Sequence, residues 1–549
     1  MKKNRWIIIG IALFVIVAIG NYIWVNAQMD SLYAFRSLLH DAPPAPGEAF
    51  DWAQEEEPTR RIVFILVDAL RNDTSHKTDV MPHLNELRTQ GAWATSHSQL
   101  PSYSAPGYSV IGTGAWPHLS DGPAMNLDYE NIPTWTQDNI FSAAHRAGLK
   151  TAISGYYWFE KLIPQNDVDA SFYTPDEDSA ADRAVVDAAL PWIESGDYQL
   201  VFIHLDQVDY AGHHEGGPQD PRWNEAAKRA DDHIREIVSQ LDLELDTVII
   251  TSDHGQIDSG GHGGHEEIVL TEPLVLAGAG ITPGQYPDTK MVDIAPTITA
   301  LLGANIPATS QGHILFDMLT FLPEQEIALK EAQDTQLRQL HAAYSEAIGD
   351  PLPIREDFGV VDGTNFAVDA MLLQQEEKTR RLRFNLPVAL AILPAYLIFR
   401  SWKKIKWLFA GAIAYFFLFN IYYAYIAKRT YSLSSVAGLE SFTQFNAVTA
   451  SVLLGGIWLF LMLKLDFFKK GASEIAETTI ILTILTLYLV SLPILWHYAV
   501  NGFMVTWYLP NFPIMFRGFL GMIQSIMVAV TGIVLTGVGA LATQLTKKS

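Results

Sequence analysis

The chain has 549 residues, a formal net charge of −23 at pH 7 and no cysteine. The length predicts several domains, and the acidic balance excludes a typical nucleic-acid binder, which presents a basic face. The lack of cysteine excludes disulfides, thiolate-bound zinc and a thiol nucleophile. Charge is unevenly distributed: residues 384–549 hold 12 Lys and Arg against 4 Asp and Glu, whereas residues 1–383 hold 25 against 56. An acidic, soluble section therefore precedes a basic, apolar one.

The chain starts with a short basic segment and an apolar stretch from about Trp6 to Val25. This stretch suits either a membrane-spanning helix of about 20 residues or a signal peptide, for which residues 25–27 offer a small-residue cleavage site. We favour an uncleaved transmembrane anchor at residues 1–27, because the apolar run is long. Both interpretations send the next segment across the membrane. Residues 28–58, rich in proline and glutamate, are typical of a tether.

Apolar runs of strand length recur in the following section. They occupy residues 61–68, 200–206, 247–250 and 273–277. Helix-like stretches alternate with them, at residues 81–90, 139–147 and 223–241. This alternation predicts an α/β fold with a mostly parallel sheet buried on both faces. Asp68, Asp209 and Asp253 lie at or just beyond strand ends, which is where open parallel sheets carry their sites.

The remainder of the chain predicts a connector and a membrane domain. Residues 323–384 are helix-like and polar at first and end in a basic cluster at residues 378–383. Residues 385–549 contain apolar stretches that suit about five transmembrane helices. The expected spans are about 385–399, 407–426, 442–463, 478–498 and 516–541.

Basic residues between the spans predict the orientation. Residues 400–406, 464–470 and 547–548 fall on the same side as the basic N-terminus, which the positive-inside rule makes cytoplasmic. We therefore expect a multi-pass protein of the cell membrane with both termini in the cytoplasm and residues 27–384 outside it. The 378–383 cluster and the pair Lys428-Arg429 run against the rule.

The largest group of candidate metal-binding residues follows the apolar run that ends near residue 250. Asp253 and His254 are followed by His262 and His265 in a glycine-rich segment. A single histidine there would more often belong to an ordinary polar loop. Several imidazoles and a carboxylate that converge at a strand end are what a metal site needs, and glycine lets the backbone turn tightly around it. We therefore expect a metal site.

Two other segments supply further side chains that could take part in such a metal site. Asp209 and His213 are four residues apart, so both can face one point from a turn or a first helical turn. Ser104 lies in a proline-bounded turn, and so does Ser102. Acids, histidines and a serine suffice for two metal ions, which suit an in-line displacement at phosphorus. Metal coordination would activate a serine that is otherwise a poor nucleophile near neutral pH.

Two neighbouring polar residues allow two interpretations. His204 and Asp206 could orient metal ligands through hydrogen bonds, or they could pack at the rim of the sheet. His214 is expected to be exposed beside His213.

The ordered set of motifs resembles the alkaline phosphatase superfamily, and within it the type I phosphodiesterase/nucleotide pyrophosphatase group. The resemblance is strongest to the membrane branch that contains the GPI ethanolamine-phosphate transferases. The matching pieces are Val67–Arg71, Pro101–Gly107, Asp209–His213, Ser252–Gly255 with Gly261–Gly263, and Asp293–Thr297 with Leu301–Gly303. The resemblance covers roughly residues 60–320. It implies an alkaline-phosphatase-like three-layer α/β/α sandwich at residues 59–322, acting as a metallo-phosphodiesterase.

The resemblance also implies a role for each site residue. One divalent metal ion would be surrounded by Asp68, Ser104, Asp253 and His254. The second would be held by Asp209, His213 and His262. Ser104 would be the nucleophile, at a position where the family more often has threonine. Oxygen and nitrogen donors without thiolate suit zinc, with manganese as the alternative.

Some assignments have competitors. Ser102 is the alternative nucleophile, and His265 competes with His262 as a ligand; we favour Ser104 and His262. Asn126 would correspond to a phosphate-contacting asparagine of the nucleotide pyrophosphatases, through an alignment that crosses an insertion.

The expected function is phosphoryl-group transfer through a covalent serine intermediate, by a phosphodiesterase or a phosphoethanolamine-type transferase. The membrane domain favours a lipid-linked phosphate ester, either a phospholipid or a lipid-linked glycan. One alternative is a nucleotide pyrophosphatase, a phosphomonoesterase or a sulfatase-like hydrolase, although Tyr108 stands where the sulfatase signature has arginine. The other is an inactive binding module on a membrane bundle, against which the complete ligand set argues.

Overall fold

The computed structural model describes residues 2–52, 57–349, 378–381, 383–436, 438–465 and 471–546. They form two compact units, and each is considered by itself. The helical unit comprises residues 1–32, 375–505 and 510–549, and the α/β unit comprises residues 33–374 and 506–509. The five-part division expected from the sequence stays a prediction, and residues 53–56 of its tether and 350–377 of its connector lie outside the described residues.

The described part of the α/β unit is built on a nine-stranded sheet with the order β4-β3-β5-β1-β6-β7-β2-β8, in which β9 also pairs with β2. The strands are β1 (Arg61–Val67), β2 (Ala92–His97), β3 (Thr151–Tyr156), β4 (Ala170–Thr174), β5 (Leu200–Leu205), β6 (Asp246–Thr251), β7 (Thr271–Gly278), β8 (Gly284–Gln285) and β9 (Thr289–Lys290). Strands β4, β3, β5, β1 and β6 are parallel, which confirms the expected mostly parallel sheet. The apolar run at residues 273–277 is also a strand, but β7 runs antiparallel to both of its neighbours.

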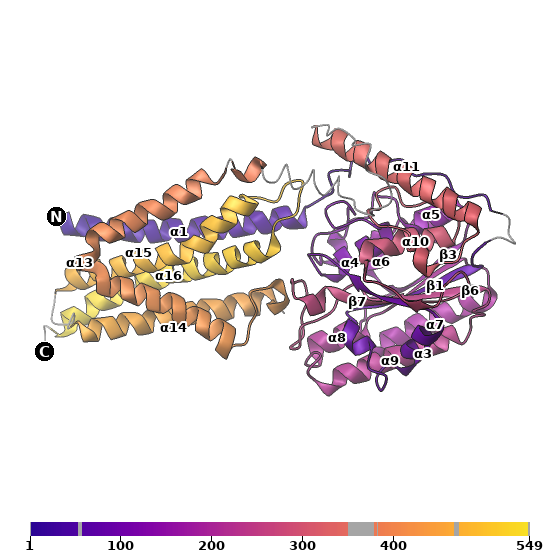
Figure 1. Ribbon diagram of the computed structural model, residues 1–549. Helices are drawn as coiled ribbons and strands as arrows, with labels where there is room; N and C mark the ends of the chain where they lie inside the picture. Colours follow the sequence, from indigo (N-terminus) through magenta and orange to yellow (C-terminus); the bar gives the residue numbers. More distant parts are fainter. Residues whose placement is uncertain are drawn as a thin grey trace. The chain divides into compact units, whose positions relative to one another are not determined.

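Helices cover both faces of the sheet, as expected for a three-layer sandwich (Figure 1). One face carries α4 (Ser104–Thr113), α5 (Ile140–Arg146), α6 (Trp158–Leu162), α10 (Ile294–Leu301) and α11 (Pro323–Ile348). The other carries α3 (Pro82–Gln90), α7 (Ser179–Ser195), α8 (Gln207–His214) and α9 (Pro221–Val238). The stretches expected at residues 81–90, 139–147 and 223–241 correspond to α3, α5 and α9.

Alternate side chains of β1 enter two separate cores. Those on one face are Ile62, Phe64 and Leu66, and those on the other are Val63, Ile65 and Val67. All are fully buried, and each such side chain stabilises the fold by about 1.5–3 kcal/mol relative to an exposed one. A central strand packed on both faces must be apolar throughout, which explains the continuous run in the sequence.

The helical unit consists of α1 (Lys2–Tyr33), α13 (Asn385–Ile421), α14 (Leu439–Lys464), α15 (Ala472–Asn501) and α16 (Phe512–Thr546). Among the described residues, six helical stretches are long and apolar enough to cross a membrane. They are Trp6–Tyr33, Lys378–Lys403, Ile405–Ile426, Leu439–Lys464, Ala472–Asn501 and Phe512–Ala542. This finding supports the expected multi-pass membrane protein.

Most boundaries of these stretches differ from the expected ones by a few residues. The stretch Lys378–Lys403 extends beyond the expected span 385–399 at both ends, and α13 continues as one helix through residues 400–406, which were expected to lie between two spans. Helix α1 continues to Tyr33, beyond the expected end of the anchor. The orientation in the membrane stays a prediction, and residues 466–470 and 547–549 of the expected cytoplasmic clusters lie outside the described part of the chain.

Candidate active site

Three adjacent strands bring the predicted acids to one edge of the sheet. Asp68 directly follows β1, and Asp253 lies two residues beyond β6. Asp209 lies in α8, which begins just after β5. Because β5, β1 and β6 are adjacent and parallel, their carboxyl ends meet. The strand ends therefore position the acids as expected from the apolar runs.

One group of side chains gathers at the end of β1. Asp68, Asp253 and His254 are buried, and their potential ligand atoms lie within 4.8 Å of one another. The His254 Nε2 atom lies 3.3 Å from Asp253 Oδ2 and 3.6 Å from Asp68 Oδ1. Ser104 Oγ lies 3.2 Å from the same nitrogen. The structure thus brings together the four residues expected around the first metal ion.

The two candidate serines face different ways. Ser104 is the first residue of α4, and its hydroxyl faces His254. Ser102 instead donates a hydrogen bond to the Gly264 carbonyl at 2.8 Å. The backbone N–H of Ala105 donates to Asn126 Oδ1 at 3.0 Å, so Asn126 lies directly beside Ser104. Of the two serines, Ser104 is therefore the one that faces His254, and it lies at a helix N-terminus that suits a phosphate.

A second group lies between α8 and the loop after β6. His213 Nε2 is 2.9 Å from His262 Nε2 and 3.4 Å from Asp209 Oδ2. The distance from His262 Nε2 to Asp209 Oδ1 is 3.7 Å. Two imidazole nitrogens and a carboxylate that face one point suit a shared cation. Gln256 Nε2 donates to Asp209 Oδ1 at 2.5 Å, so this carboxylate is held in place by the same loop that carries His262.

One glycine-rich loop joins the two groups. The rings of His254 and His262 are stacked with centroids 4.0 Å apart, and Asp209, His254 and His262 form a further buried cluster that could hold a metal. Gly260 has a φ of 81°, and a Cβ on it would lie 2.1 Å from the Gly212 carbonyl oxygen. Only glycine fits this close approach of the loop to α8. The loop therefore serves both groups.

His265 lies on this loop but is exposed, whereas His262 is buried. His265 belongs to none of the potential metal clusters among the described residues. His214 is exposed, as expected.

The buried carboxylates fit a bound cation. Burial and the neighbouring Asp253 raise the pKa of Asp68, and burial raises the pKa of Asp253. Among the described residues, Asp68 Oδ1 and Asp253 Oδ2 have no hydrogen-bond partner. Burial alone would raise the pKa of Asp209, but His213 and other histidines lower it below its usual value. Buried carboxylate oxygens without a hydrogen bond are costly unless they coordinate a cation, so the donor set fits the implied metal ions.

Tyr108 and His204 both contact the Oδ2 atom of Asp68. The Tyr108 hydroxyl donates to Asp68 Oδ2, and His204 Nε2 lies 3.1 Å from the same oxygen. Burial lowers the pKa of His204 to about 3, so its ring is neutral. Asp206 belongs to a third buried cluster with Asp68 and Asp209. His204 and Asp206 therefore contact or adjoin the site instead of merely packing at its rim.

Tyr108 and Gln256 were not expected in the site from the sequence. The one signal for Tyr108 is its spacing of four residues from Ser104, which puts both on one face of α4. No comparable signal exists for Gln256, because its contact with Asp209 depends on the path of the loop.

Known proteins resemble the chain over this unit. Residues 62–313 match the family model of type I phosphodiesterase/nucleotide pyrophosphatase. The catalytic subunit of GPI ethanolamine phosphate transferase 2 of Homo sapiens is 28% identical over 327 residues, which cover 54% of this chain and 31% of that protein. GPI ethanolamine phosphate transferase 2 of Yarrowia lipolytica is 25% identical over 344 residues, which cover 58% of this chain and 40% of that protein. The match thus spans about a third of the length of these relatives.

Among solved structures, murine ectonucleotide pyrophosphatase/phosphodiesterase 5 is 14% identical, with a TM-score of 0.40. The alignment covers 47% of this chain and 100% of that one.

The match to the family model begins in β1 and ends after α10, so it includes Asp68, Ser104, Asp209, Asp253 and His262. The similarity to the type I phosphodiesterase/nucleotide pyrophosphatase family model therefore covers the part of the chain that carries the candidate site.

Proposed function

We propose that this protein is a membrane-embedded, metal-dependent enzyme that transfers a phosphoethanolamine-type group between lipid-linked substrates through Ser104. The observation that carries the proposal is the Ser104 hydroxyl at the start of α4, 3.2 Å from His254 and beside a buried acid cluster. The names of the sequence relatives support the transferase over a simple hydrolase. The six apolar helices support a substrate in the membrane.

The ligand assignment is part of this proposal. One divalent ion is held by Asp68, Ser104, Asp253 and His254. The other is held by Asp209, His213 and His262. When bound, zinc or manganese ions would supply the positive charge that lowers the pKa of the serine hydroxyl and offsets charge on the phosphate oxygens.

The protein groups then have separate tasks. Ser104 loses its proton to solvent, and its Oγ forms a bond to phosphorus while the bond to the leaving alcohol oxygen breaks; that oxygen takes a proton from solvent. An acceptor alcohol later loses its proton and takes the group from Ser104, whose oxygen is protonated again. The Asn126 amide, held beside Ser104 through Ala105, would donate to a phosphate oxygen. Tyr108 and His204 hold Asp68 in place through hydrogen bonds. Water completes the second step if no acceptor is present, so hydrolysis of a diester is the simplest assay.

The test is a comparison of two serine variants in the full-length protein. Ser104→Ala should lower hydrolysis of an aryl phosphodiester by roughly 10³-fold or more, as loss of a nucleophile does. Ser102→Ala is the matched control and should retain most activity, since its hydroxyl contacts a carbonyl. Full activity in Ser104→Ala would contradict the assignment.

The transferase is distinguished from the hydrolase by product analysis. Phosphatidylethanolamine with a labelled headgroup is supplied together with a glycan acceptor. We expect the label on the acceptor. Release of free phosphoethanolamine at the same rate with and without acceptor would instead identify a hydrolase.

A further inference from the structure

A pocket in the helical unit contains polar side chains that the proposed reaction does not use. Its volume is about 290 Å³, and residues of α13, α15, α16 and the segment after α13 line it. Its polar lining residues are Asn420, Tyr431, Arg517 and Gln524, and its apolar ones include Phe416, Val490 and Leu520. Polar side chains among apolar helices are costly and are usually retained for a task. The pocket therefore suits an occupant with a polar and an apolar part.

Arg517 is the one charged residue of the apolar stretch Phe512–Ala542. Its side chain is exposed, and no carboxylate in the described part of the chain forms an ion pair with it. A charge in a membrane helix is costly unless it reaches the level of the lipid headgroups or binds an anion. The Arg517 guanidinium is therefore available to a ligand.

Gln524 offers a second donor, farther along the same helix. It lies seven residues after Arg517, so the two share one face of α16 and are about 10 Å apart along its axis. Gln524 is 8% exposed, and its Oε1 atom accepts a hydrogen bond from the Tyr415 hydroxyl at 3.3 Å. Its Nε2 group has no hydrogen-bond partner among the described residues. A buried amide that does not donate is costly, so this group requires an acceptor.

Two further polar residues form the wall of the pocket near Arg517. The Tyr431 hydroxyl donates to Asn420 Oδ1 at 2.5 Å, and Asn420 Nδ2 donates to the Phe416 carbonyl at 2.6 Å. Burial raises the pKa of Tyr431, and the charge of Arg517 opposes this rise, so the guanidinium lies near the tyrosine. The hydroxyl proton of Tyr431 is used within the protein, which leaves Arg517 as the donor at this level.

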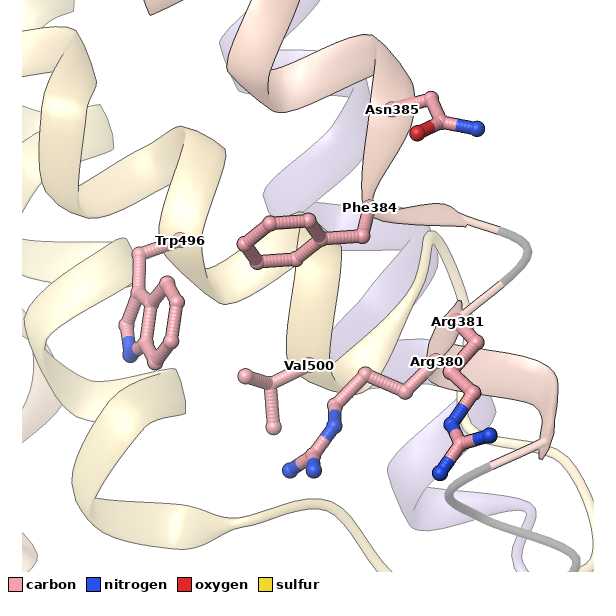
Figure 2. Close-up of a pocket in the computed structure, with 6 residues that line it drawn as sticks. All are labelled: Arg380, Arg381, Phe384, Asn385, Trp496 and Val500. Atoms are coloured by element: carbon pink, nitrogen blue, oxygen red, sulfur yellow. The ribbon is translucent and has the colours of Figure 1, made fainter.

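Aromatic residues near the end of α15 indicate the depth of the pocket. Figure 2 shows the ring of Phe384 pointing toward Trp496 in a different pocket of the same unit, and the two rings meet with centroids 6.4 Å apart. Aromatic rings at the ends of apolar helices mark the level of lipid headgroups. Pro493 lines the present pocket and lies about one turn before Trp496, on the side of the apolar interior. Arg517, in the second turn of α16, is thus close to the headgroup level, whereas Gln524 lies deeper.

We propose that this pocket binds one phospholipid of the membrane, with the phosphate at Arg517 and a glycerol ester carbonyl at Gln524 Nε2. A guanidinium matches two phosphate oxygens in charge and in planar hydrogen-bonding geometry. In a phospholipid the ester carbonyls lie between the phosphate and the acyl chains, so the order of its groups matches the order of the donors along α16. The apolar wall contacts the chains. The site belongs to the helical unit and does not depend on the proposed reaction at Ser104.

The first test measures lipid binding to the full-length protein in detergent by native mass spectrometry. The probe is dioleoyl phosphatidylglycerol, which lacks the ethanolamine group of the proposed substrate. Dioleoylglycerol lacks the phosphate and glycerol phosphate lacks the chains, so both should bind more weakly. Arg517→Gln should weaken binding of the phospholipid about tenfold or more, as loss of a hydrogen bond from a charged group does.

The matched control is Lys428→Gln, which removes an exposed charge three residues from Tyr431 without changing the pocket lining. It should bind the phospholipid as the unmodified protein does. Equal loss in Lys428→Gln and Arg517→Gln would indicate diffuse attraction and overturn the site. Equally tight binding of dioleoylglycerol or of glycerol phosphate would overturn it as well. Ser104→Ala should bind normally, which separates failure of this site from failure of the proposed reaction.

The second test uses the ether-linked analogue of the same phospholipid, which lacks the ester carbonyls. The unmodified protein and Arg517→Gln should bind the ester about two- to tenfold more tightly than the ether, which is the range for a neutral hydrogen bond. Gln524→Leu should bind both lipids equally. The assignment of Gln524 fails if the unmodified protein shows no preference or if Gln524→Leu retains it.

A measurement on the unmodified protein covers the case in which a variant does not fold. Phospholipid should slow the reaction of Arg517 with phenylglyoxal, read by peptide mass spectrometry. The reference is Arg338 of the α/β unit, whose side chain is 58% exposed and whose rate should not change. No selective protection of Arg517 would contradict the proposal.

Discussion

Tyr108 donates its hydroxyl proton to Asp68 from one turn beyond Ser104, so a single helix carries the proposed nucleophile and a bond that orients a proposed ligand. The tyrosine ring also stacks on Phe159 with centroids 4.5 Å apart. Burial raises the pKa of Tyr108 well above its usual value, so the hydroxyl stays protonated and can donate. The residue thus has a packing role and a polar role that substitution can separate.

Tyr108→Phe should keep the packing and remove the hydrogen bond. Loss of a partner that orients a metal ligand typically lowers metal affinity or activity 10–100-fold. A zinc titration against a competing chelator measures the effect, and thermal unfolding should show little change. Tyr129→Phe is the control, because that hydroxyl contacts Glu160 away from the acid cluster. Equal zinc affinity in both variants would contradict the role of Tyr108.

Asp182 links acidity to the stability of the fold. It accepts hydrogen bonds from the Asp206 backbone N–H at 2.7 Å and from Gln207 Nε2 at 2.6 Å. Burial nevertheless raises its pKa from 3.8 to about 7. The folded carboxyl therefore binds its proton more tightly than the unfolded one. Its contribution to stability is complete below pH 4 and is lost as the pH rises to about 7.

The prediction is a pH-dependent difference between the unmodified protein and Asp182→Asn, which keeps the size and one acceptor. The unfolding temperature of the unmodified protein should fall more between pH 5 and 7.5 than that of the variant. This rise in the pKa of Asp182 corresponds to a loss of about 4 kcal/mol, at most, in the free energy of unfolding. The variant controls for all other titrating groups, and parallel pH curves would show that Asp182 does not contribute.

At the scale of elements, the glycine loop after β6 determines whether the two groups of potential metal ligands form one site. Gly260 brings the loop against the Gly212 carbonyl of α8, and α8 carries Asp209 and His213. A side chain at Gly260 would push the loop from the helix. His262 would then move from its partners in the second group.

Gly260→Ala should therefore lower metal affinity and diesterase activity by at least tenfold. Gly148→Ala is a matched control, because Gly148 also has a positive φ, of 77°, but a Cβ there meets nothing within 4 Å. The control should lose about 1 kcal/mol of stability from backbone strain and keep its activity. Metal titration and thermal unfolding of both variants check the prediction, which fails if both behave alike.

The strands that form the site were predictable, and the direction of β7 was not. Buried parallel strands such as β1 need apolar residues on both faces, so their runs stand out in the sequence. The run in β7 looks the same, because burial of a strand does not depend on its direction. The length of α13 was also not predictable, since this one helix continues through residues 400–406, which separate two of the expected spans.

For the whole molecule, the acid cluster is expected to couple metal binding to folding. Asp68 and Asp253 are buried, each has one oxygen without a hydrogen-bond partner, and the charge of Asp253 raises the pKa of Asp68, so a metal-free fold should be destabilised. A ligand that binds only the folded state stabilises it by about 2.7 kcal/mol at 100 times its dissociation constant. The α/β unit should therefore be less stable without metal.

Chelation should lower the unfolding temperature of the protein, and zinc or manganese should restore it. Asp253→Asn should reduce this response, because it removes a proposed ligand. Asp258→Asn is the control, since Asp258 is 79% exposed and pairs with Arg71. Calorimetry with and without chelator measures the response. An equal response in both variants would show that the stabilising metal binds elsewhere.

The sequence by itself determined the α/β sandwich, the acids at its strand ends and the number of apolar spans. These properties depend on local features, namely apolar runs, their length and the residues that follow them. Only the tertiary structure decided which serine faces His254, which histidine of the loop is buried with Asp209, and that Tyr108 contacts Asp68. These contacts join residues that are between 40 and 150 positions apart in the chain. Their geometry depends on the path of the loops and the packing of α4, which no local pattern encodes.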